Sequence, residues 1–496
     1  MKSREDETPL LFEQDVPGRV GVDLPEADWP PTDRLGGMRR TRPIGLPSLS
    51  EPDVVRHYTR LSRLNYGIDS GFYPLGSCTM KHNPRLGEKL ARLPGFSEIH
   101  PFQPEASVQG ALKVMELLAH WLSALTGLPA VALSPAAGAH GELCGILAIR
   151  AALEHQGNAR RRVLVPDSAH GTNPATAVRC GYAVETVPGN GDGRVDLAAL
   201  KARLGDDVAA LMLTNPNTLG LFERDILHIA EAVHAAGAYF YLDGANFNAL
   251  VGRVRMADLG VDAMHINLHK TFSTPHGGGG PGAGPTMLSQ ALAPFAPLPY
   301  VSRRADGSLT LVENGLQAME DGQLPLGRLK GFHGQFGVFV RALAYMLSMG
   351  GDGLAQASAD AVLNANYLLA ELQEDLSAPF PGFCMHEALF DDRFLKGTNV
   401  STLDLAKALI DEGFHPMTVH FPLVVHGAML VEPTESEGKE TLDRFIAAMK
   451  SLAARARAGD AEYFHAAPRL APRRRLDETR AARTPVLRWK RRSTDQ

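Results

Sequence analysis

The sequence predicts an α/β fold in which a mostly parallel sheet is covered by helices on both faces. Three continuous apolar runs, each of strand length, lie at residues 162–166, 208–213 and 238–242. Runs without polar alternation are typical of strands buried on both faces, and such sheets are parallel and need crossover helices. A helical pattern at residues 225–236, ended by Gly237, supplies one crossover. Residues 130–285 are therefore predicted to form a doubly wound α/β domain.

The elements around this domain follow from local patterns. Ser50 followed by Glu51 and Pro52 predicts a helix start, and apolar residues at helical spacing predict a helix over 107–125 that Gly127 ends. Residues 71–81 are too broken for a helix and too apolar for a tail, so they are expected to form a packed loop near a site. Long helices are predicted over 327–349 and 354–376, and strands with a helix at 404–412 over 383–433.

These elements define four regions. Prolines and charges in the first fifty residues predict an extended arm, and the last residues are basic. The predicted regions are an arm at 1–55, a large α/β domain at 56–325, a smaller α+β domain at 326–455 and a basic extension at 456–496. The extension is expected to be solvated or packed, although its charge could also bind an acidic partner.

Composition excludes several classes of protein. The 496 residues suffice for two or three domains, and 44% hydrophobic with 21% charged residues is an ordinary soluble profile. A net charge of -5 offers no general field for nucleic acid or anionic membrane, and no apolar run approaches the roughly 20 residues of a membrane helix. The acidic N-terminus resembles no targeting signal, and the four cysteines form no CxxC pair. We therefore expect a cytoplasmic protein with reduced thiols.

Polar groups follow four predicted strands at the point where each strand ends. These groups are the segments 167–170, 214–217, 243–246 and 269–270. The carboxyl ends of parallel strands meet at one edge of a sheet, where loop amides and helix N-termini also converge. The sequence therefore predicts one site at this edge.

Lys270 is the residue of this set that points most directly to a reaction. It lies where the apolar segment 263–268 stops and shortly before four glycines at 277–280. An amine at the edge of a buried sheet is partly desolvated, which favours its use as a nucleophile that bonds to a carbonyl cofactor. The alternative is a surface lysine beside a flexible loop.

The residue types at the predicted site suit pyridoxal phosphate. This cofactor needs a lysine for its aldehyde, an anion for its pyridine nitrogen, a flat group on its ring and amide donors for its phosphate. Asp243 suits the anion, with a turn-forming role as the alternative, and His170 suits the stacking group, with a structural role as the alternative. The phosphate is expected at the helix start that contains Gly138 and Ala139. Two further cofactor contacts are predicted at the strand ends, Asn215 and His269.

Other ligand motifs do not match. The glycines at 277–280 are not followed by Gly-Lys-Ser/Thr and so form no P-loop; they are expected to let the backbone pass close to Lys270 and the cofactor. His265 and His269 stand four residues apart without a third ligand at zinc spacing, so no metal site is predicted.

Several segments together carry a specific likeness to a known family. They are 73–81 (YPLGSCTMK), 135–142 (PAAGAHGE), 167–174 (DSAHGTNP), 214–220 (TNPNTLG), 243–246 (DGAN), 265–272 (HINLHKTF), 396–401 (KGTNVS), 432–435 (EPTE) and 485–489 (PVLRW). The chain resembles the P-protein of the glycine cleavage system, glycine dehydrogenase (decarboxylating), in the form split over two polypeptides. The likeness is to subunit 2, the β subunit, and covers roughly residues 40–490. Modest departures at Phe247-Asn248 and Lys81–Pro84 touch no predicted cofactor contact.

The resemblance implies the fold type I of pyridoxal-phosphate enzymes, with an architecture like that of aspartate aminotransferases. It makes Lys270 the Schiff-base lysine, Asp243 the pyridinium partner and His170 the stacking histidine. It also implies decarboxylation of glycine and transfer of the aminomethyl group to the lipoyl arm of the H-protein. The expected partners are a homologous α subunit in an α2β2 assembly, without which no activity is expected, and the lipoylated H-protein.

Two alternatives remain open on the residues alone. One is a cofactor-free regulatory subunit on the same fold, against which the joint presence of Lys270, Asp243 and His170 argues. The other is a different pyridoxal-phosphate decarboxylase or desulfurase that acts on a larger amino acid. Residue types and spacing do not choose between these reactions; the choice of glycine rests on the resemblance.

Overall fold

The computed structural model describes residues 8–489 except 23, 24, 27, 29–31, 33, 43 and 277–279. The chain divides into two compact units, Met1–Ser70 with Ala471–Gln496, and Gly71–Leu470. The second unit holds every predicted strand and every predicted site residue. Within the described residues, no helix has the length and apolar content needed to cross a bilayer.

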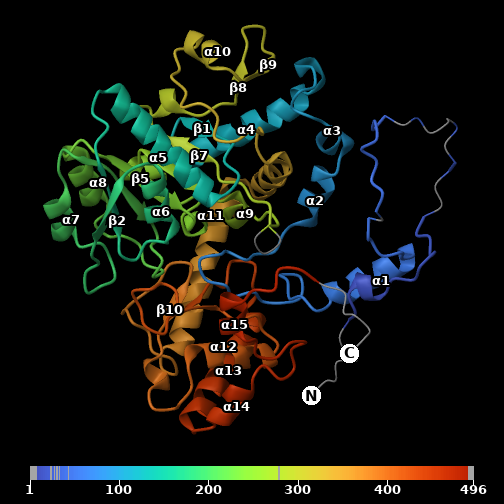
Figure 1. The fold of residues 1–496 in the computed structure, drawn as a ribbon. Coiled ribbons are helices and arrows are strands. Elements are labelled where there is room, and N and C mark those ends of the chain that lie inside the picture. The colour runs from blue at the N-terminus through green and yellow to red at the C-terminus, as the bar shows by residue number, and fades with distance from the viewer. Residues whose placement is uncertain are drawn as a thin grey trace. The chain divides into compact units, whose positions relative to one another are not determined.

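A seven-stranded sheet forms the centre of the second unit (Figure 1). Its order is β1-β7-β6-β5-β4-β2-β3, and only β7 runs antiparallel to its neighbours. The strands are β1 Ala130–Ala132, β2 Arg162–Pro166, β3 Ala183–Val187, β4 Val208–Thr214, β5 Tyr239–Gly244, β6 Ala263–Ile266 and β7 Thr286–Leu288. The expectation of a mostly parallel sheet is confirmed, and β2, β4 and β5 lie within two residues of the predicted runs.

Helices cover both faces of this sheet, as the fully apolar strands predict. Along β4, Leu211 and Leu213 pack into a core with α4 and α8, whereas Ala210 and Met212 face a second core with α5 and α6. The alternation follows from the period of two in a strand.

The helices of this part are α2 Arg85–Ala91, α3 Pro94–Ser97, α4 Gln109–Thr126, α5 Gly138–His155, α6 Thr172–Arg179, α7 Leu197–Arg203, α8 Ile226–Ala235, α9 Leu268–Thr271 and α10 Gly315–Glu320, and the hairpin strands are β8 Tyr300–Arg303 and β9 Leu309–Val312. Short 3-10 turns lie at Glu105–Ser107, Phe247–Ala249, Met256–Leu259, Ala293–Phe295 and Arg393–Leu395.

The two long helices predicted from the sequence are one element with a break. α11 runs over Phe336–Leu372 and is interrupted at Gly350, whose φ is 63° and ψ is -179°. The prediction of a helix from residue 327 is wrong for the first nine residues, because glycines there favour irregular backbone; Gly334 has φ 135°. α11 packs against α4 of the sheet part and against α13 (Lys439–Arg457) of the smaller part, so it connects the two (Figure 1).

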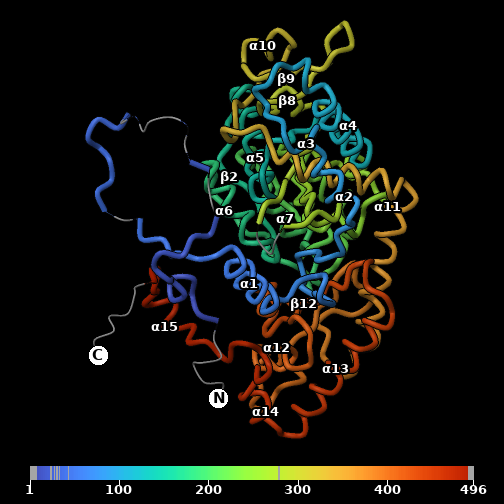
Figure 2. The backbone as a smooth tube through the Cα atoms, turned by 90° about the vertical axis from the view of Figure 1, so that its right-hand side faces the viewer, coloured from blue at the N-terminus to red at the C-terminus, as the bar shows by residue number. Residues whose placement is uncertain are grey.

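The smaller part has its own core around a three-stranded antiparallel sheet. Its order is β10-β12-β11, and its apolar residues come from α11, α12 and α13 as well as the sheet. Figure 2 shows α12, α13 and α14 gathered at the end of this unit that lies opposite the β8–β9 hairpin. The elements are β10 Ala388–Phe390, α12 Thr402–Asp411, β11 Thr418–Val419, β12 Met429–Val431, α13 Lys439–Arg457 and α14 Ala461–Ala466. This is the mixed α+β composition expected for residues 383–433.

The first unit contains little regular structure. The Ser50 hydroxyl caps α1 (Glu51–Ser62) by accepting the Asp53 N–H, as the sequence predicts. The other elements are the 3-10 turn Leu11–Glu13 and α15 Glu478–Arg483. The Phe12 and Trp489 rings stack with centroids 5.0 Å apart, so the two ends of the described chain meet within this unit. Of the predicted arm, residues 1–7, 23, 24, 27, 29–31, 33 and 43 lie outside the described residues, and of the basic tail residues 490–496 do.

Candidate functional site

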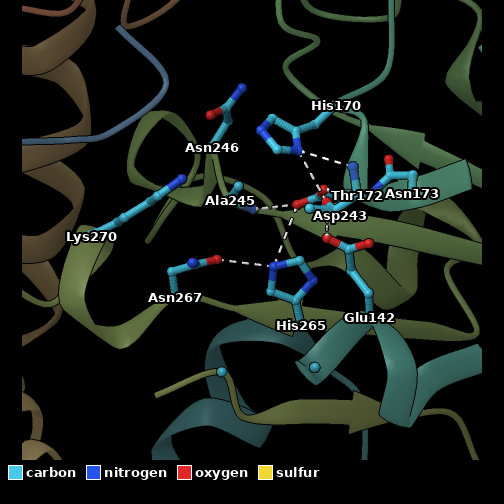
Figure 3. A network of polar contacts seen from close by, with 12 residues as sticks. Glu142, His170, Thr172, Asn173, Asp243, Ala245, Asn246, His265, Asn267 and Lys270 are labelled. Carbon is cyan, nitrogen blue, oxygen red and sulfur yellow. Dashed lines mark hydrogen bonds and ion pairs between the residues drawn. The ribbon is translucent and has the colours of Figure 1, made fainter. Parts of the chain in front are cut away.

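The carboxyl ends of β5 and β6 place two pairs of polar side chains next to each other. Asp243 is paired with His265 in the parallel register of β5 and β6. Tyr241 and Asp243 lie two residues apart on one strand, and His265 and Asn267 do so on the next, so each pair shares a face. Figure 3 shows Asp243 at the centre of the resulting network.

Asp243 is a buried carboxylate whose two oxygens are both occupied. Oδ2 accepts from the Asn173 amide at 3.0 Å, and Oδ1 accepts from the Ala245 N–H at 2.9 Å and lies 3.5 Å from His265 Nε2. Burial alone would raise the pKa of Asp243, but His265, these two donors and Lys270 lower it below its ordinary value. The carboxylate is therefore ionised at neutral pH.

His265 joins the two strands through both ring nitrogens. Its Nε2 lies 2.9 Å from Asn267 Oδ1, and its Nδ1 lies 2.6 Å from the Tyr241 hydroxyl. The two acceptors at Nε2, Asn267 Oδ1 and Asp243 Oδ1, require that this nitrogen donates. This arrangement orients the ring so that an N–H group faces Asp243.

Lys270 lies in α9, the single helical turn that begins after β6. Its Nζ donates to the Ser77 carbonyl at 2.8 Å, and this carbonyl belongs to the loop at residues 71–81 that the sequence predicts to be packed near a site. Figure 3 shows Lys270 extending from the left toward the network and His170 directly above Asp243, and Lys270 is close enough to lower the pKa of Asp243. The structure therefore brings the three principal predicted residues together.

His170 is exposed, and a chain of polar contacts orients its ring. Its Nδ1 lies 3.0 Å from the Thr172 hydroxyl, which in turn donates to Glu142 at 2.6 Å. Thr176 donates to the other oxygen of Glu142 at 3.2 Å. Burial, and then the charge of Asp243, raise the pKa of Glu142 above its ordinary value.

The N-terminus of α5 lies against the strand-end residues. The helix begins at Gly138, and a Cβ on this glycine would stand 2.6 Å from the Asn267 amide nitrogen. A side chain at Gly138 is thus excluded by the close approach of Asn267. The first N–H groups of a helix, here including those of Gly138 and Ala139, have no acceptor within the helix and are suited to bind an anion.

Asn215 and His269 complete the predicted set. Asn215 follows Thr214, which pairs with Asp243 in the sheet; its Oδ1 accepts from the Glu223 N–H at 3.1 Å. Its buried Nδ2 has no hydrogen-bond partner in the described part of the chain. The His269 Nδ1 accepts from the Ala283 N–H at 3.3 Å, and burial together with Lys270 and His276 lowers the pKa of His269 to about 3. His269 is therefore a neutral ring at neutral pH.

Other strand-end groups serve the scaffold. Asp167 accepts from the Gly189 N–H at 2.9 Å, and the Asn217 amide donates to the Gly193 carbonyl at 2.8 Å. The Asn246 amide donates to the Pro216 carbonyl at 2.9 Å. The glycines at 277–279, for which close backbone passage is predicted, lie outside the described residues.

Sequence reasoning missed the residues that support the predicted ones. These are Ser77, Glu142, Thr172, Asn173, Tyr241, His265 and Asn267. The period of two along β5 and β6 could have identified Tyr241, His265 and Asn267, because each lies two residues from another polar residue at a strand end. The position of Glu142, four residues after Gly138 in the helix, carried no comparable signal.

Comparisons with known proteins agree with this architecture. An aminotransferase class-V model matches residues 141–288, and a model described as glycine dehydrogenase, C-terminal domain, matches residues 357–467. A crystal structure of glycine decarboxylase (P-protein) of the glycine cleavage system is 24% identical, with a TM-score of 0.70 over 84% of this chain and 93% of that one. A cysteine desulfurase from Thermococcus onnurineus is 14% identical, with a TM-score of 0.60 over 78% of this chain and 95% of that one. At these identities the likeness establishes the fold type I architecture alone.

Sequence relatives are more specific. A protein of Caulobacter vibrioides named probable glycine dehydrogenase (decarboxylating) subunit 2 is 65% identical over 97% of this chain and 92% of its own length. A protein of Listeria innocua with the same name is 51% identical over 98% of this chain and 99% of its own length. Identity of this extent covers the sheet, the smaller part and the loop that meets Lys270. The chain belongs to the family of glycine dehydrogenase (decarboxylating) subunit 2.

Proposed function

We propose that this chain is the cofactor-binding β subunit of a glycine dehydrogenase (decarboxylating). Its reaction is the decarboxylation of glycine with transfer of the aminomethyl group to the lipoyl arm of the H-protein. The observation that carries this proposal is the meeting of Lys270, an ionised Asp243 and His170 at one edge of the sheet. The family, whose members are named for this activity, supports the choice of reaction.

The residues at this edge fit pyridoxal phosphate. The buried Nδ2 of Asn215 lacks a hydrogen-bond partner in the described chain and can donate to a bound group. The N–H groups of Gly138 and Ala139 would bind the phosphate, with the α5 dipole adding to the attraction. Asn215 and His269 would supply further hydrogen bonds, and Lys270 would bond to the aldehyde.

Each residue then has a defined task. The Asp243 carboxylate would hold a proton at the ring nitrogen, because its own pKa is lowered and it stays ionised. The His170 ring, oriented through Thr172 and Glu142, would cover one face of the cofactor ring. The Ser77 carbonyl accepts from the Lys270 amine and so fixes its direction.

Pyridoxal phosphate supplies an electron sink, since its conjugated protonated ring takes up the electron pair left when carbon dioxide departs. The protein contributes orientation and electrostatics. Buried, fully bonded groups such as Asp243 and His265 do this well because they need no rearrangement during the reaction.

The partners and location belong to the same proposal. The family name, subunit 2, supports a second, homologous α subunit, which we place in an α2β2 assembly. Glycine and the lipoylated H-protein are the substrates, and neither nucleic acid nor membrane takes part. We place the protein in the cytoplasm, which agrees with four cysteines that form no disulfide.

A glycine/CO2 exchange assay tests the proposal. The chain is purified and supplied with pyridoxal phosphate and lipoylated H-protein, with and without the α subunit, and incorporation of labelled bicarbonate into glycine is measured. Exchange is expected in the full mixture and not without the α subunit. The visible absorption of the bound cofactor should shift when glycine is added.

Two outcomes would replace this function by another. A protein that stays colourless after pyridoxal phosphate is supplied would favour a cofactor-free regulatory subunit. A full mixture that acts on larger amino acids and not on glycine would favour a different decarboxylase or a desulfurase. The second outcome is a real alternative because a cysteine desulfurase shares this fold, so the fold alone does not distinguish a decarboxylase from a desulfurase.

A further inference from the structure

A buried cluster of two glutamates and a histidine lies in the smaller part, beside the loop that meets Lys270. His386, Glu387 and Glu432 have completely buried side chains, and their ligand atoms lie within 4.8 Å of one another. Neither ring nitrogen of His386 has a hydrogen-bond partner in the part of the chain that the structure describes. Burial of this kind is expensive for carboxyl groups, so the cluster calls for a specific role.

Each glutamate binds one backbone N–H of the loop. Glu387 Oε2 accepts from the Ser77 N–H at 2.8 Å, and Glu432 Oε2 accepts from the Thr79 N–H at 3.0 Å. These are the residues on either side of Cys78. The carbonyl of the same Ser77 accepts from Lys270 Nζ at 2.8 Å. One residue therefore connects Glu387 to the reactive amine.

The loop needs such support because its backbone is strained. Ser77 has φ 61° and Thr79 has φ 30°, and a positive φ is unfavourable for residues with a Cβ and most of all for a β-branched one. Strained residues persist only where their surroundings over-determine them. Here the preceding residues are held by β12, since the Gly76 N–H donates to the Leu430 carbonyl, but only the glutamates bind the N–H groups of the strained pair.

We propose that Glu387 and Glu432 are positioning residues: their carboxyl groups hold the loop at Ser77 and Thr79 so that the Ser77 carbonyl orients the Lys270 amine. The proposal rests on the function proposed above for Lys270. Burial, and then the neighbouring Glu432, raise the pKa of Glu387 well above its ordinary value, which favours its neutral form. A neutral Glu387 lets two carboxyl groups share this space and still accept from the loop through their oxygens.

Two kinds of substitution distinguish anchoring of the loop by hydrogen bonds from a function that needs the negative charge of the glutamates or their binding of a metal ion. Glu387→Gln and Glu432→Gln keep the length and one acceptor oxygen but remove the ionisable group. Glu387→Asp and Glu432→Asp keep the ionisable group but shorten its reach by one methylene. If the glutamates act as anchors, the glutamine variants resemble the wild type and the aspartate variants do not; charge or metal binding predicts the reverse.

Cys78 provides a readout that needs no cofactor. It is the half-buried cysteine between the two anchored residues, whereas Cys144 and Cys180 are buried elsewhere in the sheet part. The full chain is alkylated under native conditions, and the rate at Cys78 is followed by peptide mass mapping. We expect the aspartate variants to react at least about tenfold faster and the glutamine variants within about twofold of the wild type. Asp391→Asn, which alters a buried carboxylate of the same part that binds Ser377 and Arg393, should leave the rate unchanged.

A second readout follows the cofactor in the holoenzyme. The visible absorption band of the bound cofactor is titrated with pH. Its midpoint should differ from that of the wild type in the aspartate variants and equal that of the wild type in the glutamine variants. Three results would each overturn the proposal. The first is an alkylation rate at Cys78 that is equal in all variants, and the second is a rate in the glutamine variants that matches the aspartate variants. The third is a metal ion that the wild type binds stoichiometrically and the glutamine variants do not. Faster labelling of Cys144 and Cys180 in the aspartate variants, which signals general unfolding, would also overturn it.

The cofactor assignment is judged separately. A wild-type band that Lys270→Ala retains would refute the function proposed for Lys270, whatever the Cys78 rates are. A band that depends on Lys270, combined with unaltered Cys78 rates, would refute only the anchoring role.

Discussion

The site has two sides that are built in different ways. On the sheet side, Asp243 and His265 are neighbours in the register of two parallel strands, and all their polar atoms are bonded. On the loop side, Ser77 and Thr79 depend on Glu387 and Glu432, which come from the smaller part of the unit. The first side is fixed by regular secondary structure, and the second is fixed by long-range side-chain contacts.

The carboxyl groups of the two sides differ accordingly. Asp243 faces an imidazole, an amide and an amine, which together outweigh burial and lower its pKa. Glu387 faces a second carboxyl group, which adds to burial and raises its pKa. Equal burial thus produces an ionised group on one side and favours a neutral group on the other, because the neighbours differ in charge.

The largest expected effect comes from Lys270→Ala. This change should abolish the covalent attachment of pyridoxal phosphate and the exchange activity, because it removes the amine that would bond to the aldehyde. The fold should survive, since the variant loses one hydrogen bond to the Ser77 carbonyl, worth about 1 kcal/mol. Visible spectra and thermal unfolding measure the two effects. Lys270→Arg serves as control, because it keeps the positive charge and should lose the spectrum equally.

Asp243→Asn tests the electronic part of the sheet side. The loss of a preorganised charge should lower kcat by on the order of 100-fold, with a smaller effect on cofactor affinity. Steady-state exchange kinetics and cofactor titration compare the two quantities, and equal losses would contradict the electronic role. Asp262→Asn is the matched control, because Asp262 caps the Phe240 N–H at the opposite end of β5 and should leave kcat unchanged.

The two sides also differ in what the sequence could predict. Asp243 and Lys270 were predictable because an apolar run predicts a strand, and a parallel sheet collects the residues that follow its strands at one edge. The loop at 71–81 was predictable as a packed segment near a site. Its anchors were not, because Glu387 and Glu432 lie 310 and 353 residues away from the N–H groups they bind. No local pattern records a contact at such a separation.

Lys81 tests how firmly the end of the loop is held. Its buried amine donates to Glu435 at 2.6 Å and to Asn248 at 2.8 Å. Burial alone would lower the pKa of Lys81, but Glu435 and Tyr345 raise it, so the pair is ionised. Lys81→Ala should destabilise the protein by about 3–5 kcal/mol, because it leaves a buried carboxylate without its cation. Thermal unfolding measures the loss.

The double variant Lys81→Met with Glu435→Gln is the control for this prediction. It removes both charges; the glutamine oxygen still accepts from the Asn248 amide, and its NH2 group can donate to the Tyr345 hydroxyl. We expect it to recover most of the stability, since a neutral pair carries no uncompensated charge. A double variant as unstable as Lys81→Ala would mean that packing of the lysine, and not its charge, holds the loop end.

Glu223 separates two explanations of the contrast between Asp243 and Glu387, namely location in the fold and charge of the neighbours. It lies on the sheet side, yet its carboxyl group accepts from the Val195 N–H and the Asn217 amide and has no lysine or imidazole within hydrogen-bond distance among the described residues. Burial raises the pKa of Glu223 from 4.5 to about 7; its hydrogen bonds and the charge of Arg194 oppose this only in part, and the charge of Asp225 adds to it. A place on the sheet side is therefore not enough to keep a buried carboxyl group ionised; its neighbours must also outweigh burial.

The raised pKa of Glu223 makes the stability of the folded protein depend on pH in a defined direction. Between pH 4.5 and about 7 the folded state binds a proton that the unfolded state has released, so stability falls as pH rises through this window. A pKa difference of this size lowers the free energy of unfolding by about 3 kcal/mol across the window. Glu223→Gln keeps an acceptor for both donors and removes the titration, so its melting temperature relative to the wild type should be higher at pH 8 than at pH 5. A difference that is the same at both pH values would show that Glu223 is ionised in the fold, and that burial does not outweigh its hydrogen bonds and the charge of Arg194.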